Sequence, residues 1–301
     1  MRHPLLLLFS FFSIFTFAQD RNCDPVVLTG IDVNCILGEM PDDIVAFKYQ
    51  SGSWIQIPIQ IDERVLLDIQ MPYDQVELAA DTSCLDDSYE NESWDVLFYA
   101  DAKTDTGAGT TIRFDADAEL VFMKMDIGNK SSATIYPNGT LTGSVCEIAV
   151  TEPLDNDAIL GYIYLFVQNG SLDQAAGVDY ITYNFTYESN YLTEYISCPD
   201  RNNGGSNNLE NSVISTSDYE LGFSQRWKEN DLKIKVGDTT DILDRHQIFI
   251  NTSACNSNED NFSELEGAHI AAVDGPIRAI RSVMGSASGP FTQLDIKATK
   301  C

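Results

Sequence analysis

The chain has 301 residues, which is long enough for one large domain or two of medium size. Hydrophobic residues make up 44% and aromatic residues 10% of the sequence, which supports a sizeable core and argues against a disordered protein. The formal net charge of −28 argues against nucleic acid as a partner, because such a surface repels phosphates. The acidic surface is either simply well solvated or attracts divalent cations and basic partners.

The first 18 residues are predicted to be a secretory signal peptide. Arg2 precedes an apolar run over 5–17, and Thr16 and Ala18 occupy the −3 and −1 positions of a cleavage site before Gln19. The alternative is a membrane anchor, but the run is shorter than the roughly 20 apolar residues that span a bilayer. We therefore expect a secreted or cell-surface protein whose mature chain has no transmembrane segment.

Alternating hydrophobic and polar residues, rather than helical periodicity, run through the rest of the sequence. In the stretch WIQIPIQID (54–62), four isoleucines fall on one face, while Gln60 and Asp62 fall on the other face, which is expected to be solvent-exposed. Pro58 favours an edge strand because it cannot donate to a neighbour. The segments 119–126 and 161–168 are apolar on both faces, which is typical of central, covered strands. Further strands are expected at 44–49, 95–99, 145–151, 178–188, 231–236 and 268–273.

Strands separated by Gly, Asn, Asp and Pro turns predict an all-β protein of antiparallel β-sandwiches, with few or no helices after the signal peptide. The segments 151–158 and 199–208 are the candidate boundaries, because both are rich in turn-forming residues. We expect an N-terminal β domain over 19–155 and a C-terminal β-sandwich region over 156–301 that is truncated at its end.

Seven cysteines follow the signal peptide, and in a secreted chain they are expected to pair, which leaves one over. Cys23 and Cys35 are near enough in sequence to close a short loop, although the connectivity stays open. No CxxC spacing occurs, so a zinc site has little support. Seven Asn-x-Ser/Thr sequons are typical either of a glycosylated eukaryotic exterior or of a polar bacterial exoprotein.

The segment 99–126 is a candidate cation site. Hard cations such as Ca²⁺ prefer several carboxylate and carbonyl oxygens, which closely spaced aspartates in Gly-rich loops supply. The pattern does not match an EF-hand loop, because the Gly and Glu positions differ. A calcium site and a solvated acidic loop are the two interpretations of Asp101, Asp105, Asp115, Asp117 and Asp126.

A second acidic group, Asp62 and Glu63, is followed directly by Arg64. Two carboxylates can serve as acid and base in glycoside cleavage, but neighbours on a strand point to opposite faces and make a poor pair. An ion pair of Arg64 with Glu63 at a strand end is the simpler interpretation.

The two histidines that follow the signal peptide, His246 and His269, are both near Arg278 and Arg281 in the sequence. Histidine carries protons near neutral pH and arginine neutralises an acidic sugar, so His246, His269 and Arg278 are the candidate catalytic residues of a polysaccharide lyase or hydrolase. The alternative is that each histidine is an ordinary surface or strand residue. Arg278 and Arg281, spaced by three, point to opposite faces of a strand, so each is expected to neutralise a different carboxylate.

The blocks SWIQIPIQIDER, DADAELVFMKMDIG and EGAHIAAVDGPIRAIRSVMGSASGPFTQ, in this order, resemble a group of large, uncharacterised secreted bacterial proteins. The resemblance runs from about residue 43 to the C-terminus and implies no activity. A weaker resemblance, to galactose-mutarotase-like β-sandwich exoproteins of polysaccharide-utilising bacteria, implies a sandwich with a carbohydrate-related role. Ala118 stands where those proteins have Asp, which weakens the cation site that the resemblance implies.

Three functions stay open at this stage. The leading hypothesis is a carbohydrate-associated protein that binds polysaccharide or a cell-surface glycan, with calcium as a candidate cofactor; exposed Tyr and Trp beside Asp and Asn would support it. The second is a polysaccharide lyase or hydrolase with the His and Arg site. The third is an adhesion or structural module without a small ligand.

Overall fold

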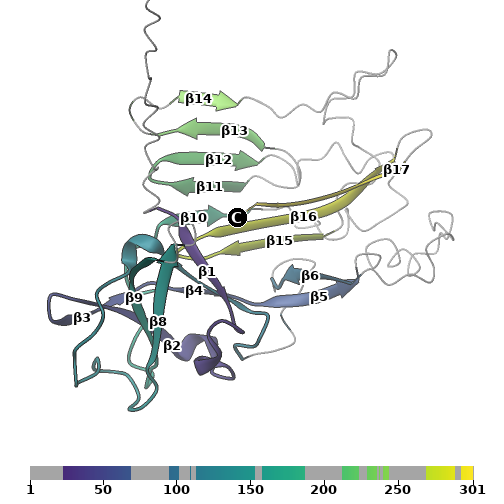
Figure 1. The fold of residues 1–301 in the computed structure, drawn as a ribbon. Coiled ribbons are helices and arrows are strands. Elements are labelled where there is room, and N and C mark those ends of the chain that lie inside the picture. The colour runs from purple at the N-terminus through teal and green to yellow at the C-terminus, as the bar shows by residue number, and fades with distance from the viewer. Residues whose placement is uncertain are drawn as a thin grey trace, which may run out of the picture.

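The protein consists of strands joined by turns, as seen in a computed structural model (Figure 1). Three short 3-10 helices accompany the strands in the described residues: η1 (Asn34–Ile36), η2 (Pro41–Asp43) and η5 (Lys124–Asp126). None of the helices that the structure describes has the length and apolar character needed to cross a membrane. The predicted all-β, antiparallel fold is confirmed. The structure describes residues 23–68, 95–101, 109, 113–152, 158–186, 212–223, 229–235, 237, 240–243, 269–288 and 293–300.

A β-sandwich forms the N-terminal part of the described chain. Its larger sheet has the order β3-β2-β9-β8, and its smaller sheet the order β1-β7-β4. The strands of the larger sheet are β2 (Ile44–Gln50), β3 (Ser53–Ile57), β8 (Cys146–Glu152) and β9 (Ala158–Val167). Those of the smaller sheet are β1 (Pro25–Thr29), β4 (Gln60–Asp62) and β7 (Glu119–Met123).

The core of the sandwich follows from strand alternation, because every second residue points to the same face. Ala46 and Leu165 of the larger sheet meet Leu120 and Phe122 of β7, and all four are fully buried. The other face of β7 is covered as well, since Val121 and Met123 pack against Ile277 of a distant turn. This explains why all five residues of β7 are buried, and a central strand is confirmed for 119–123, whereas residues 124–126, predicted to continue it, form η5.

Pro58 divides the predicted strand 54–62 into two strands of different sheets. β3 ends at Ile57 and lies at the edge of the larger sheet, whereas β4 begins at Gln60 and lies at the edge of the smaller sheet. The edge position is confirmed. The expectation that Gln60 and Asp62 face solvent is wrong, because their exposed fractions are 4% and 3%.

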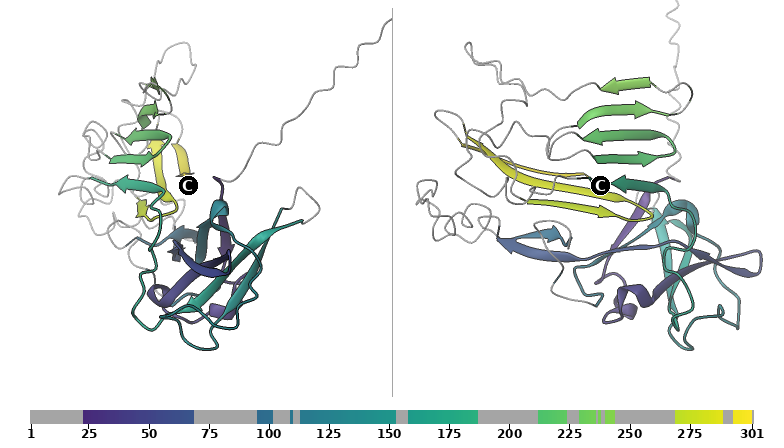
Figure 2. Two further views of the ribbon diagram at one scale, coloured as in Figure 1. Left: turned by 90° about the vertical axis from the view of Figure 1, so that its left-hand side faces the viewer. Right: turned by 180° about the vertical axis from the view of Figure 1, so that it is seen from behind.

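The rest of the described chain forms two antiparallel sheets and a hairpin, drawn beside the sandwich in Figure 2. The hairpin pairs β5 (Arg64–Asp68) with β6 (Asp95–Tyr99). A five-stranded sheet follows chain order: β10 (Ile181–Asn184), β11 (Ser212–Thr216), β12 (Tyr219–Phe223), β13 (Glu229–Ile234) and β14 (Thr240–Leu243). The third sheet consists of β15 (His269–Asp274), β16 (Ala279–Ser288) and β17 (Gln293–Lys300).

The pairing of β9 crosses the boundary that we expected between residues 155 and 156. β9 lies between β2 and β8 and is hydrogen-bonded to both, so the sandwich of the N-terminal part extends to at least residue 167. A second apolar cluster joins the later sheets, where Tyr183 and Phe223 pack with Ala272 and Ala279.

One disulfide closes the sandwich. Cys35 of η1 is bonded to Cys146 of β8, with a Cα–Cα distance of 6.0 Å, so Cys35 does not close a short loop with Cys23. Cys23 is exposed and carries a free thiol. The other cysteines fall outside the described residues.

Candidate functional site

The turn before β16 inserts Arg278 into a buried cluster of charged side chains. Its Nε donates to Oδ2 of Asp62 at 2.9 Å, and its Nη2 contacts the same oxygen at 2.8 Å and Oε2 of Glu119 at 2.5 Å. Nη1 of Arg64 lies 3.2 Å from Oε1 of Glu119, so two arginines face two carboxylates. The expectation that Arg278 neutralises a buried carboxylate is confirmed.

The side-chain amide of Gln60 holds this turn against the sandwich. Its Oε1 accepts from the backbone N–H groups of Ile277 at 3.2 Å and Arg278 at 2.9 Å, and its Nε2 donates to Asp62 at 2.8 Å. Gly275 passes so near that a Cβ atom there would lie 2.3 Å from Cδ of Gln60. Glycine is therefore needed for the close approach of the turn.

The cluster contains buried charges of both signs, and their attraction offsets the cost of burying Asp62 only in part. Burial raises the pKa of the Asp62 carboxyl, and the opposing effects of Arg278 and Gln60 only partly offset this. Burial alone would lower the pKa of the Arg278 guanidinium, but Asp62 and Glu119 outweigh it and raise that pKa. Arg278 is thus held in its charged form by partners that surround it.

Arg278 joins distant parts of the chain and is closed to large ligands. Its side chain is 7% exposed, and its guanidinium lies 5.4 Å from the ring centroid of Tyr99. Arg281 is also buried and lies over the ring of Phe223 at 4.5 Å. His246 lies outside the described residues, and His269 begins β15 with its side chain outside the description, so a catalytic group of His246, His269 and Arg278 stays a prediction.

The described aspartates of the predicted calcium site have different hydrogen-bond partners, and of these Asp115 and Asp117 share one turn. Asp101 accepts a hydrogen bond from the backbone of Ala272 at 2.8 Å, and Asp126 accepts one from the hydroxyl of Tyr180 at 2.8 Å. Oδ1 of Asp115 accepts from the backbone N–H of Asp117 at 3.2 Å and of the following residue at 3.1 Å, which closes a turn.

Asp105 lies outside the described residues. Within the part of the chain that the structure describes, no three His, Cys, Asp or Glu side chains gather as a metal site would require. Calcium binding stays a prediction.

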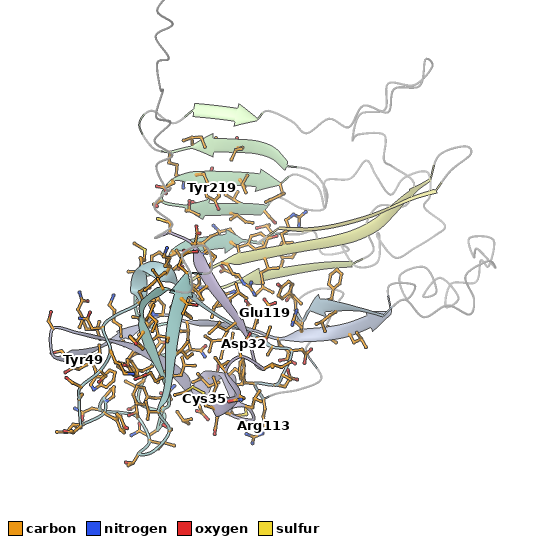
Figure 3. All side chains as sticks on the ribbon, viewed as in Figure 1. Asp32, Cys35, Tyr49, Arg113, Glu119 and Tyr219 are labelled. Atoms are coloured by element: carbon orange, nitrogen blue, oxygen red, sulfur yellow. A yellow bond between two sulfur atoms is a disulfide. The ribbon has the colours of Figure 1, made fainter. Side chains whose placement is uncertain are left out.

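Aromatic residues cover the outer face of the larger sheet, the face turned away from the sandwich core. Strand register brings them together, because Tyr49 is paired with Trp54 across β2 and β3, and Phe47 with Tyr164 across β2 and β9. The rings meet edge to face: the centroid of Trp54 lies 5.1 Å from that of Tyr49 and 5.0 Å from that of Tyr164. Figure 3 shows Tyr49 at the side of the molecule away from Glu119 of the charged cluster.

The loop 131–138 covers part of this aromatic face and is fixed to it by hydrogen bonds. Nε1 of Trp54 donates to the carbonyl oxygen of Ile135 at 2.8 Å, and the backbone N–H of Ser131 donates to the hydroxyl of Tyr164 at 2.6 Å. Burial raises the pKa of that hydroxyl, which donates to Glu147 at 3.1 Å. The loop therefore forms a wall that is in place before any ligand arrives.

Between the loop and the sheet lies an open pocket of about 620 Å³. Tyr49, Trp54 and Tyr136 line it with aromatic surface, and Tyr136 is 38% exposed. The exposed side chains of Ser132, Thr134 and Asn138 also line the pocket and supply hydroxyl and amide groups. An aromatic surface beside neutral polar groups suits a ligand with apolar faces and hydroxyl edges.

Sequence reasoning missed this pocket, although a signal for it was present. Phe47 and Tyr49 alternate along one strand, and Tyr162, Tyr164 and Phe166 alternate along another. Alternation shows that each set shares a face, but only the pairing of β2 with β9 shows that the two sets share the same face.

No protein-family model, curated protein or solved structure matches this chain.

Proposed function

We propose that this is a secreted protein that binds polysaccharide, and that the aromatic pocket on the larger sheet is its binding site. The observation that carries the proposal is the pocket wall, where Tyr49, Trp54 and Tyr136 lie beside Ser132 and Asn138. Sugar rings have apolar faces that stack on aromatic rings, and hydroxyl edges that exchange hydrogen bonds with such polar groups.

Two further features support the proposal. The loop 131–138 is hydrogen-bonded to the aromatic sheet at both Trp54 and Tyr164, so little ordering cost is added when a ligand binds. The pocket is open rather than enclosed, which allows a polymer to enter at any point along its length.

The proposal is tested by retention of the chain without its expected signal peptide on a panel of immobilised and insoluble polysaccharides, with calcium and with EDTA. We expect retention on at least one polymer. Retention that EDTA abolishes would add calcium to the proposal, and retention that EDTA leaves unchanged would remove calcium from it. A folded protein that no polymer retains would contradict carbohydrate binding and favour an adhesion or structural module.

A further inference from the structure

We infer that the pocket selects uncharged glycans over acidic ones, an inference that rests on the proposed polysaccharide binding. Its basis is the chemistry of the pocket wall: none of the described residues that line it is an Asp, Glu, Lys or Arg. The polar atoms that Ser132, Thr134 and Asn138 offer are neutral hydroxyl and amide groups. Such groups match the hydroxyls of a neutral sugar without any charge to compensate.

An acidic glycan would bring a carboxylate or sulfate that this wall does not neutralise. Proteins recognise such anions by charge-assisted hydrogen bonds from Arg or Lys, and an anion moved out of water without such a partner loses its hydration uncompensated. A basic group near the same sheet face is Lys130, whose Nζ lies 3.0 Å from Oε1 of Glu147 and 5.2 Å from the ring centroid of Tyr162. Lys130 is therefore already paired with an acid.

The net charge of the whole chain also disfavours the binding of acidic glycans. With 46 acidic and 18 basic residues, the protein repels a polyanion before contact, whereas a neutral polymer is unaffected. Binding through stacking and neutral hydrogen bonds also predicts little dependence on salt, because salt screens charges and not these contacts.

The experiment compares retention in affinity gels that contain neutral polymers (β-glucan, xylan, galactomannan, starch) or acidic polymers (alginate, polygalacturonate, chondroitin sulfate), at low and high NaCl. We expect retention by one or more neutral polymers that changes less than about twofold with salt. Thr134→Arg places a cation in the wall, and Thr134→Gln is the control for its size. Thr134→Arg is expected to gain salt-sensitive retention on an acidic polymer of about tenfold or more over Thr134→Gln.

Each failure has its own signature. Salt-sensitive retention of the unaltered protein by acidic polymers alone would overturn the inference and leave polysaccharide binding in place. Equal retention of Thr134→Arg and Thr134→Gln on every acidic polymer would show that wall charge does not select the ligand, which also overturns it. Retention by no polymer would overturn both the inference and the proposed function.

Discussion

Replacing Arg278 by Met is expected to destabilise the protein strongly. Methionine keeps much of the side-chain volume but removes the charge that Asp62 and Glu119 share, at 2.8 Å and 2.5 Å from Nη2. Glu119 keeps Arg64 at 3.2 Å, whereas Asp62, at 3% exposure, stays buried and keeps its hydrogen bonds from the Gln60 amide. Removing one partner of a buried ion pair costs about 3–5 kcal/mol, and that is the expected loss in the free energy of unfolding.

Urea unfolding of the oxidised protein, followed by tryptophan fluorescence, measures this loss. Arg113→Met is the matched control, because Arg113 is exposed and donates to the carbonyl oxygen of Gly38 at 2.7 Å (Figure 3 labels it). The control is expected to cost about 1 kcal/mol or less. A second variant, Arg278→Met with Asp62→Leu, removes the stranded charge and is expected to recover part of the loss. If Arg278→Met costs no more than Arg113→Met, the cluster does not hold the turn to the sandwich and the reasoning fails.

Three further predictions concern the stability of the fold. Burial raises the pKa of Asp62 above 3.8, so the contribution of Asp62 to stability is full at lower pH and falls as the pH rises through the folded pKa. The urea midpoint of Asp62→Asn should therefore lie furthest below that of the wild type in acid. A difference between the two midpoints that widens toward neutral pH would contradict this. Gly275→Ala should lower the free energy of unfolding by about 1–3 kcal/mol, because its Cβ would lie 2.3 Å from Cδ of Gln60. In a double-mutant cycle, the same substitution in a Gln60→Ala background should cost less. Equal costs in both backgrounds would show that the added methyl group does not clash with Gln60. Cys35→Ala opens a disulfide that spans 111 residues and should lower the free energy of unfolding by about 4–5 kcal/mol. Cys23→Ser, at an exposed free thiol, should change the unfolding midpoint little. Equal effects of the two substitutions would exclude the pairing of Cys35 with Cys146.

Strand positions could be predicted closely because local alternation determines them. The segment 95–99 matches β6, and 44–49 matches β2 to within one residue, since each contains a run of apolar residues bounded by polar or turn-forming ones. The same alternation explains why Asn184 is exposed on β10 next to buried Tyr183.

The buried polar residues could not be predicted, because their partners are distant in the sequence. Gln60 and Asp62 have the pattern of a solvent-facing edge, and they are buried only because Arg278, 216 residues after Asp62, packs against them. The aromatic pocket has the same cause, since it depends on the register between β2, β3 and β9. Local patterns identify which residues share a face of one strand, but not which face of another strand they meet.

The central claim, that the aromatic pocket binds polysaccharide, is tested most directly by the affinity of Tyr136→Ala for a polymer that retains the protein. Tyr136 lines the pocket and is 38% exposed, and Tyr219→Ala is its control, because Tyr219 is 36% exposed on β12. We expect Tyr136→Ala to raise the Kd about tenfold or more, or about 1.4 kcal/mol, and Tyr219→Ala to leave the Kd unchanged. Equal Kd values for the two variants and the unaltered protein would contradict the account.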